Sequence, residues 1–390
     1  MLLFDAIDTK LKTVVAHLQQ ASRKERSPAL YDECIAAMQR ASELGDDAAF
    51  VLIAQSFGLV IDQHGYSNES IAWLTQAIER AQRCGEFGEQ SHLLHLIGRA
   101  YYSRAEYRLA LDYWTEGMAV AERDNDRISW SWCKLGMGQV CDALDSPLLA
   151  VQVFTELGQS LNTLDGSARA LPMAQRARFA MRLRELRVIN TVNLGVNLLR
   201  LGEYDSALTH FQQAHTAALA EAMDDIASEC QVRIAEVFAT RGESARALEL
   251  LLPAQSALEA CSHHWGLATL FLLRAKCQSD LGELAQAMAS TALAREAAER
   301  ANVKHIALRI EREAALAAEK MGDLRQALES MKRAAQLQTE LDHGTQSQML
   351  RDLAELANRT ASQAASQTAS EGANAQPAPK RTRRAKSTGV

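Results

Sequence analysis

The sequence predicts an all-α solenoid, and three observations lead to this fold class. The first is composition: the 390 residues include only 6 Pro and 20 Gly, and 5% are aromatic, while Ala, Leu, Glu and Arg are abundant. The second is a recurrence of small residues at one spacing. The third is a motif that marks the junction between expected helices. Repeats of about 40 residues are typical of solenoids, in which each unit buries its apolar face against its neighbours.

Small residues recur every 40 positions along most of the chain. They are Gly58, Gly98, Gly138, Gly195, Ala235, Ala275 and Ala315, and only the step from Gly138 to Gly195 is longer, at 57 residues. We expect each of them to be buried in the middle of the first helix of a helix pair.

Four segments, 202–208, 242–248, 282–288 and 322–328, share the motif Gly-acid-x-x-x-Ala-apolar. The glycine is expected to end one helix in left-handed backbone, and the acid to favour the positive end of the next helix dipole. A larger residue four positions after the alanine, then another alanine, complete one buried stripe. The larger residues are Leu74, Trp114, Phe154, Phe211, Leu251, Thr291 and Met331.

These registers divide the chain into eight antiparallel helix pairs. Residues 1–47 form a degenerate N-terminal pair that acts as a cap, with its first helix near residues 5–20. Residues 48–358 form the solenoid, closed by an apolar-striped capping helix near 348–358, and the extra residues after Gly138 form an insertion at about 157–186. We expect residues 359–390 to be a disordered tail, because they are rich in Ala, Ser, Gln and Thr and end in basic residues.

This pattern resembles the tetratricopeptide repeat (TPR) family over about residues 5–347. The residues that carry the match best are Asn193, Gly195, Ala207, Phe211 and Ala214. The family unit has about 34 residues, so these extended repeats are more similar to those of bacterial signalling and sensory TPR proteins. The resemblance implies a right-handed superhelix in which the first helix of each pair lines a concave groove.

Helical spacing around the small residues selects the side chains that would face this groove. The candidate partner-binding residues are His92, His95, Arg99, Tyr102, Trp132, Gln139, Asn193 and Arg233. Trp, Tyr and Arg are enriched at interaction hot spots, although ordinary packing between repeats explains Arg99, Tyr102 and Trp132 equally well. The helix around Gly195 is apolar nearly all round, so either the insertion packs across it or it forms the floor of an apolar pocket.

Arginines in and after the insertion suggest contact with an anion or an acidic partner. They are Arg176, Arg178, Arg182 and Arg184, and the alternative is a solvated helix face balanced by acids of neighbouring repeats. The chain has a formal net charge of −6, and the five basic residues within 380–386 leave −11 for the rest. Nucleic acid is therefore a lesser candidate partner.

The motifs indicate no enzyme, no cofactor and no metal site. The sequence contains no Gly-rich phosphate loop, nucleophile elbow or His-Glu-x-x-His, and no nearby acid completes a metal site with His92 and His95. Seven dispersed cysteines predict buried free thiols in a reducing compartment. Since no apolar run is long enough to span a bilayer and no secretory signal is evident, we expect a cytoplasmic protein.

The expected function is that of a non-catalytic scaffold or adaptor, which binds a peptide or protein segment in its concave groove. A homo-oligomer is compatible with this function. The alternative is a sensory or regulatory protein, in which a peptide or small ligand changes the pitch of the superhelix and so controls a signalling effector. A nucleic-acid-associated protein that uses the tail and the insertion is a third hypothesis.

Overall fold

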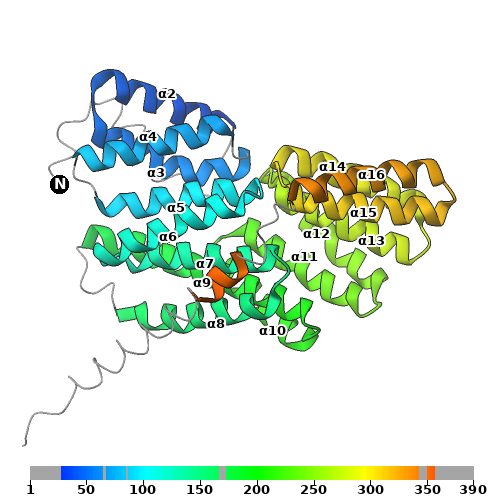
Figure 1. Ribbon diagram of the computed structural model, residues 1–390. Coiled ribbons are helices and arrows are strands. Elements are labelled where there is room, and N and C mark those ends of the chain that lie inside the picture. Colours follow the sequence, from blue (N-terminus) through cyan, green and yellow to red (C-terminus); the bar gives the residue numbers. More distant parts are fainter. Residues whose placement is uncertain (1–27, 65–66, 85–86, 167–172, 342–348, 356–390) are drawn as a thin grey trace, which may run out of the picture.

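The computed structural model describes residues 28–64, 67–84, 87–166, 173–341 and 349–355, and within these ranges the chain is helical and has no strand (Figure 1). None of the helices in these ranges is both long and apolar enough to cross a membrane. The helix expected near residues 5–20 and the tail at 359–390 lie outside the described residues.

The described helices alternate between first and second helices of a pair. The first helices are α3 (Asp47–His64), α5 (Phe87–Ser103), α7 (Arg127–Ala143), α9 (Met173–Arg200), α11 (Asp224–Thr240), α13 (His264–Asp280) and α15 (Lys304–Met321). The second helices are α2 (Pro28–Leu44), α4 (Asn68–Cys84), α6 (Tyr107–Arg123), α8 (Pro147–Thr163), α10 (Tyr204–Ala220), α12 (Ser244–Ala260), α14 (Leu284–Ala301) and α16 (Leu324–Leu341). This order confirms the predicted register of helix pairs from α3 onwards, and α2 lies where the second helix of the first pair is predicted.

The helices form two layers. Each helix packs on its neighbours in sequence, and each first helix also packs on the first helix of the next pair, from α3 on α5 through to α13 on α15. The first helices therefore make an inner layer and the second helices an outer one, as the repeat pattern predicts.

Within the early pairs, a large side chain of the second helix lies on a glycine of the first. A Cβ atom would lie 2.4 Å from the Trp114 ring at Gly98, 2.5 Å from the Phe154 ring at Gly138 and 2.7 Å from the Phe211 ring at Gly195. All three rings are fully buried. The absence of a side chain at these glycines is what lets the two helices of each pair approach each other.

The motif glycines end the later first helices as predicted. Gly202, Gly242, Gly282 and Gly322 have φ between 80° and 84°, the left-handed conformation that closes a helix. In the earlier repeats the corresponding residues are Ala105 and Asp145, with φ of 61° and 59°. In the early repeats this turn places a non-glycine residue in left-handed backbone, which costs free energy. In the later repeats a glycine adopts the same conformation without that cost.

The predicted core position at Met331 is wrong, because 62% of this side chain is exposed. In α16 the buried residues are Ala327, Ser330, Ala334 and Leu341. These residues are mostly small, so α16 lies close against α15 and its buried stripe passes through Ser330 in place of Met331.

The solenoid turns far enough for its last repeats to meet its first ones (Figure 1). Helix α14 packs against α3, and the ring of Tyr102 at the end of α5 lies 6.3 Å from that of His305 in α15. The short helix at residues 349–355 lies within the predicted capping helix, and its Met349 and Leu353 belong to a core cluster that also contains residues of α6, α7, α8 and α16. This helix therefore connects the last pair to the early repeats.

Candidate functional site: the inner face of the solenoid

The described part of the insertion forms the N-terminal half of α9 and lies across earlier first helices. Arg178 donates a hydrogen bond to Oε1 of Gln55 in α3 at 2.9 Å and lies 3.8 Å from Glu89 of α5. Residues 173–186 and the segment around Gly195 form one continuous helix. Residues 173–186 therefore do not pack across the Gly195 segment, because a single helix cannot fold back on itself, whereas the start of the predicted insertion lies in α8, which packs on α9.

Four aromatic side chains pack together beneath this extension of α9. The ring of His95 lies 6.3 Å from that of His92, 5.3 Å from that of Trp132 and 6.4 Å from that of Trp114. His95 is 4% exposed and Trp132 6% exposed. The Nε1 atom of Trp114 donates to the backbone oxygen of His95 at 3.1 Å, which fixes the tryptophan against α5.

Both histidines of this cluster are neutral. Burial lowers the pKa of His92 well below 6.5, and the guanidinium of Arg182 lowers it further. Burial also lowers the pKa of His95, with Arg99 and Arg182 adding to the effect. An Nη2 atom of Arg182 lies 2.8 Å from Nδ1 of His92, and since a guanidinium can only donate, the His92 ring carries its proton on Nε2.

Several buried polar atoms of the first helices have no hydrogen-bond partner among the described residues. Among them are Nε2 of Gln55, Nδ1 of His95, Nε1 of Trp132 and Nδ1 of His305. Buried polar groups in proteins are nearly always paired with protein, water or ligand. These four atoms are therefore buried polar groups of the inner layer that no described residue satisfies.

The later half of the inner face has a balanced charge network. Arg233 is 7% exposed and lies 2.8 Å from Glu236 and 3.9 Å from Glu229, all on α11. Arg309 of α15 lies 3.7 Å from Glu236. Burial raises the pKa of Glu236, but Arg233 and Arg309 outweigh it and hold that pKa below its ordinary value. The guanidinium of Arg233 is thus neutralised within its own helix.

The other predicted partner-binding residues have different surroundings. Tyr102 lies against Tyr107 and Trp114, and burial raises its pKa well above 10. Asn193 donates to the backbone oxygen of Ile189 in its own helix at 2.8 Å. Arg99 and Gln139 are half-buried on α5 and α7.

The remaining predicted anion-binding arginines fit the alternative interpretation better. Arg184 lies 2.7 Å from Glu221, so an acid of the next repeat balances it, as Glu89 does for Arg178. Arg176 is exposed. Arg182 alone of the four predicted arginines contacts the cluster of His92, His95, Trp114 and Trp132.

One inner-face contact escaped the sequence prediction. His305 contacts Tyr102, but the repeat pattern does not single it out. Gln55 and Glu236 lie in registers that the pattern assigns to the inner face, three residues before Gly58 and one residue after Ala235. His305 precedes Arg309 by four residues and so shares its helix face. Its contact with Tyr102 arises from the closure of the superhelix, which no spacing between adjacent repeats encodes.

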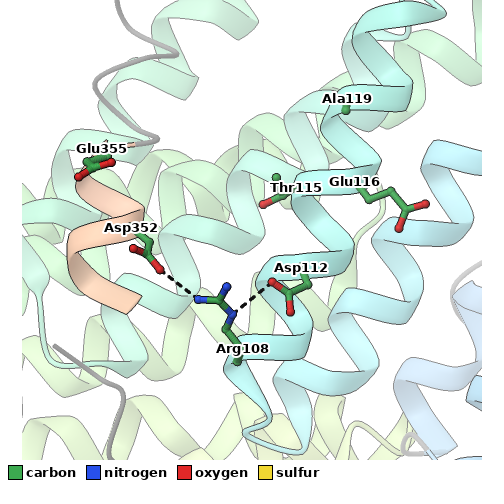
Figure 2. Close-up of a pocket in the computed structure, with 7 residues that line it drawn as sticks. All are labelled: Arg108, Asp112, Thr115, Glu116, Ala119, Asp352 and Glu355. Carbon is green, nitrogen blue, oxygen red and sulfur yellow. Dashed lines mark hydrogen bonds and ion pairs between the residues drawn. The ribbon is translucent and has the colours of Figure 1, made fainter. Parts of the chain in front are cut away.

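A second candidate surface is an open cleft of about 600 Å³ between α6 and the helix at 349–355 (Figure 2). Arg108 lies between Asp112 at 3.3 Å and Asp352 at 3.0 Å. Glu116 and Glu355 add two more carboxylates to the lining. An excess of negative charge disfavours nucleic acid at this cleft.

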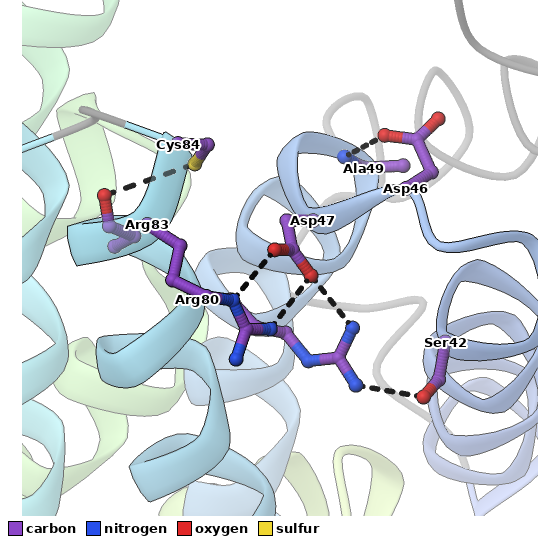
Figure 3. Close-up of polar contacts among 8 residues, drawn as sticks. Ser42, Asp46, Asp47, Ala49, Arg80, Arg83 and Cys84 are labelled. Carbon is purple, nitrogen blue, oxygen red and sulfur yellow. Dashed lines mark hydrogen bonds and ion pairs between the residues drawn. The ribbon is translucent and has the colours of Figure 1, made fainter.

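The polar network at the start of α3 has a structural role (Figure 3). Asp47 accepts hydrogen bonds from Arg80 at 2.8 Å and from Arg83 at 2.9 Å, both on α4, and Arg80 also donates to Ser42 of α2 at 2.7 Å. The hydrogen bond from Arg83 is the main cause of the lowered pKa of Asp47. The network ties α2, α3 and α4 together.

Metal-binding and thiol chemistry find little support in the described ranges. No group of three or more His, Cys, Asp or Glu side chains there could hold a metal ion. All seven cysteines are free, as predicted, and Cys84 is exposed whereas five of the others are buried.

Comparison with known proteins places the fold. No family model matches the chain, and no curated protein matches its sequence. Its structure is similar to a Rap protein complexed with competence and sporulation factor, with 13% identity, a TM-score of 0.58 and coverage of 90% of this chain and 93% of that one. It is also similar to the Rap conjugation gene regulator of the plasmid pLS20 in complex with the Phr* peptide, with 16% identity, a TM-score of 0.50 and coverage of 86% and 95%. At these identities the likeness concerns the fold, which is that of TPR-like solenoids.

Proposed function

We propose that this TPR-like solenoid is a non-catalytic scaffold that binds a peptide or an extended protein segment on its inner face. The observation that carries the proposal is the set of buried, unpartnered polar atoms at Gln55, His95, Trp132 and His305 among the described residues. Polar atoms of this kind cost stability unless something pairs with them, so their concentration on one face indicates a binding surface.

The similar structures support a peptide as the class of ligand. One of them is a Rap protein complexed with competence and sporulation factor, and the other is a Rap regulator in complex with the Phr* peptide. A rigid inner layer of packed helices suits this task, because a preformed surface limits the ordering cost of binding to the ligand.

The experiment is a selection of random peptides on the purified protein with two matched glutamine variants. Gln139→Arg adds a bulky charge at a half-buried position of the inner layer, whereas Gln152→Arg places the same change on the exposed surface of α8 in the outer layer. We expect wild type and Gln152→Arg to retain the same peptides and Gln139→Arg to lose them, with helicity equal in all three. Equal retention by both variants would place binding elsewhere.

A regulatory role is the second candidate, and the closure of the superhelix favours it. The first and last repeats meet through α3 with α14, Tyr102 with His305, and Arg108 with Asp352. The last contact is a surface ion pair, with side chains 59% and 44% exposed, and such pairs add little stability. A ligand that contacts both ends would therefore shift the balance between open and closed forms.

Small-angle scattering separates the two roles. A rigid scaffold keeps the same radius of gyration when a selected peptide is added. A regulatory protein changes its radius, and the closure variant Arg108→Glu responds differently from wild type.

A further inference from the structure

Arg182 stands out on the inner face because it makes no ion pair with a carboxylate among the described residues. Its guanidinium hydrogen-bonds to His92, which is neutral. The side chain is only partly exposed, and burial lowers its pKa. A guanidinium has five N–H donors, so this one retains most of its capacity to bind an anion.

The acids that influence Arg182 from further away have other partners. Asp126 accepts hydrogen bonds from the backbone nitrogens of Ile128 and Ser129 at the start of α7. Glu89 lies 3.8 Å from Arg178. Glu185 and Arg178 are the other charged groups that act on Arg182, and their effects oppose each other. None of these acids forms an ion pair with the guanidinium of Arg182 among the described residues.

Arg233 shows how this fold neutralises an inward-facing arginine whose role is to stabilise the structure. That residue has two carboxylates on its own helix within 4 Å. A buried charge without such a partner is costly, and proteins retain one mainly where it binds something. The contrast between the two arginines therefore points to a ligand at Arg182.

The surroundings of Arg182 complete a site for a planar anion. His92 fixes the guanidinium from one side, and its neutral ring adds no charge of its own. A guanidinium pairs with a carboxylate through two parallel hydrogen bonds. The remaining N–H groups of Arg182 are therefore suited to a carboxylate that the described residues do not supply.

We infer that Arg182 binds a carboxylate group of the peptide held on the inner face. This inference rests on the proposed function and assigns the ligand its chemistry. The carboxylate belongs either to the C-terminus of the peptide or to an acidic side chain.

The experiment compares wild type with Arg182→Gln and the matched control Arg184→Gln, whose arginine lies two residues further along α9 and pairs with Glu221. Four pools of random seven-residue peptides are offered: with or without Asp and Glu, and each with a free or an amidated C-terminus. We expect wild type and Arg184→Gln to retain peptides that carry a carboxylate, and Arg182→Gln to bind the most enriched peptide at least tenfold more weakly. The pool that survives identifies the source of the carboxylate.

Thermal unfolding supplies a readout that does not depend on peptides. Arg182→Gln should unfold at the same temperature as wild type or higher, and succinate should raise the midpoint of wild type and Arg184→Gln but not of Arg182→Gln. Equal peptide binding by Arg182→Gln, or equal retention of the amidated pool that lacks acids, would overturn the inference. If no pool is retained while the succinate effect is seen, the carboxylate site stands and the peptide function fails; if neither is seen, both fail.

Discussion

Arg182 and Arg233 lie on inner-layer helices of the same solenoid, one in its early half and one in its later half. Glu229 and Glu236 surround Arg233, whereas Arg182 contacts a neutral histidine. The halves also differ in packing: glycines face Trp114 and Phe154 in the early pairs, and Ala235 replaces the glycine opposite Leu251 in a later one. One repeat geometry thus accommodates a later half whose inward arginine is balanced by its own helix and an early half in which, as proposed above, a ligand supplies the missing negative charge.

The largest expected effect is on the free energy of unfolding, which should depend on the carboxylate partners of Arg233 but not on Arg182. Glu236→Gln leaves the buried charge of Arg233 poorly compensated and should lower the free energy of unfolding by about 3 kcal/mol. Arg182→Gln should not lower it, because no carboxylate loses its partner. Urea unfolding measures both, and the exposed pair partner Glu243→Gln serves as a control expected to change less than about 0.5 kcal/mol. Equal losses for Glu236→Gln and Arg182→Gln would remove the contrast between the halves.

The next prediction tests whether glycine opposite a phenylalanine ring and alanine opposite a leucine are interchangeable ways to pack a helix pair. Gly138→Ala should cost about 2 kcal/mol, since the added methyl group meets the fully buried Phe154 ring. Phe154→Leu in the same chain recreates the combination of Ala235 and Leu251. The double variant should therefore be more stable than the sum of the two single changes predicts, as a double-mutant cycle measures. Strict additivity would show that the two residues do not compensate each other.

The buried histidines make stability depend on pH. His92 and His95 have pKa values well below 6.5, and burial lowers that of His305 to about 4. The unfolded chain therefore binds more protons, so stability is complete above pH 6.5 and is lost as pH falls from 6.5 towards the folded pKa values. Each histidine contributes up to about 1.4 kcal/mol per pH unit in this window. His95→Gln should reduce the slope of unfolding free energy between pH 6.5 and 5; an unchanged slope would mean that His95 is not buried in its neutral form.

The smallest effect concerns the helix ends. Gly242 has φ of 84°, and no atom lies within 4 Å of the position of an added Cβ, so Gly242→Ala should cost about 1 kcal/mol through backbone conformation alone. Ala105 occupies the corresponding turn in an early repeat. Ala105→Gly should change stability by less and in the opposite direction, because relief of the backbone is partly offset by the loss of a buried methyl group. Thermal denaturation of the two variants side by side is the measurement, and a stabilising Gly242→Ala would refute the argument.

Much of the fold could be predicted because it depends on neighbours in sequence. The helix pairs, the glycine turns at 202, 242, 282 and 322, and the contacts of Gly98, Gly138 and Gly195 with a ring 16 positions later follow from spacing within one repeat. Met331 shows the limit of this approach. Its spacing fits the stripe, but the small residues of α16 bury Ser330 in its place.

The composition and periodicity of the sequence by themselves determined an all-helical solenoid with its pairs, its turns and its inner and outer layers. Only the tertiary structure decided which polar side chains meet across the inner face. Tyr102 contacts His305, which lies 203 residues later in the chain, and His92 contacts Arg182, which lies 90 residues later. The physical reason is that each repeat adds a small rotation to the superhelix, and the sum over many repeats, together with the direction of the long helix α9, brings distant residues together.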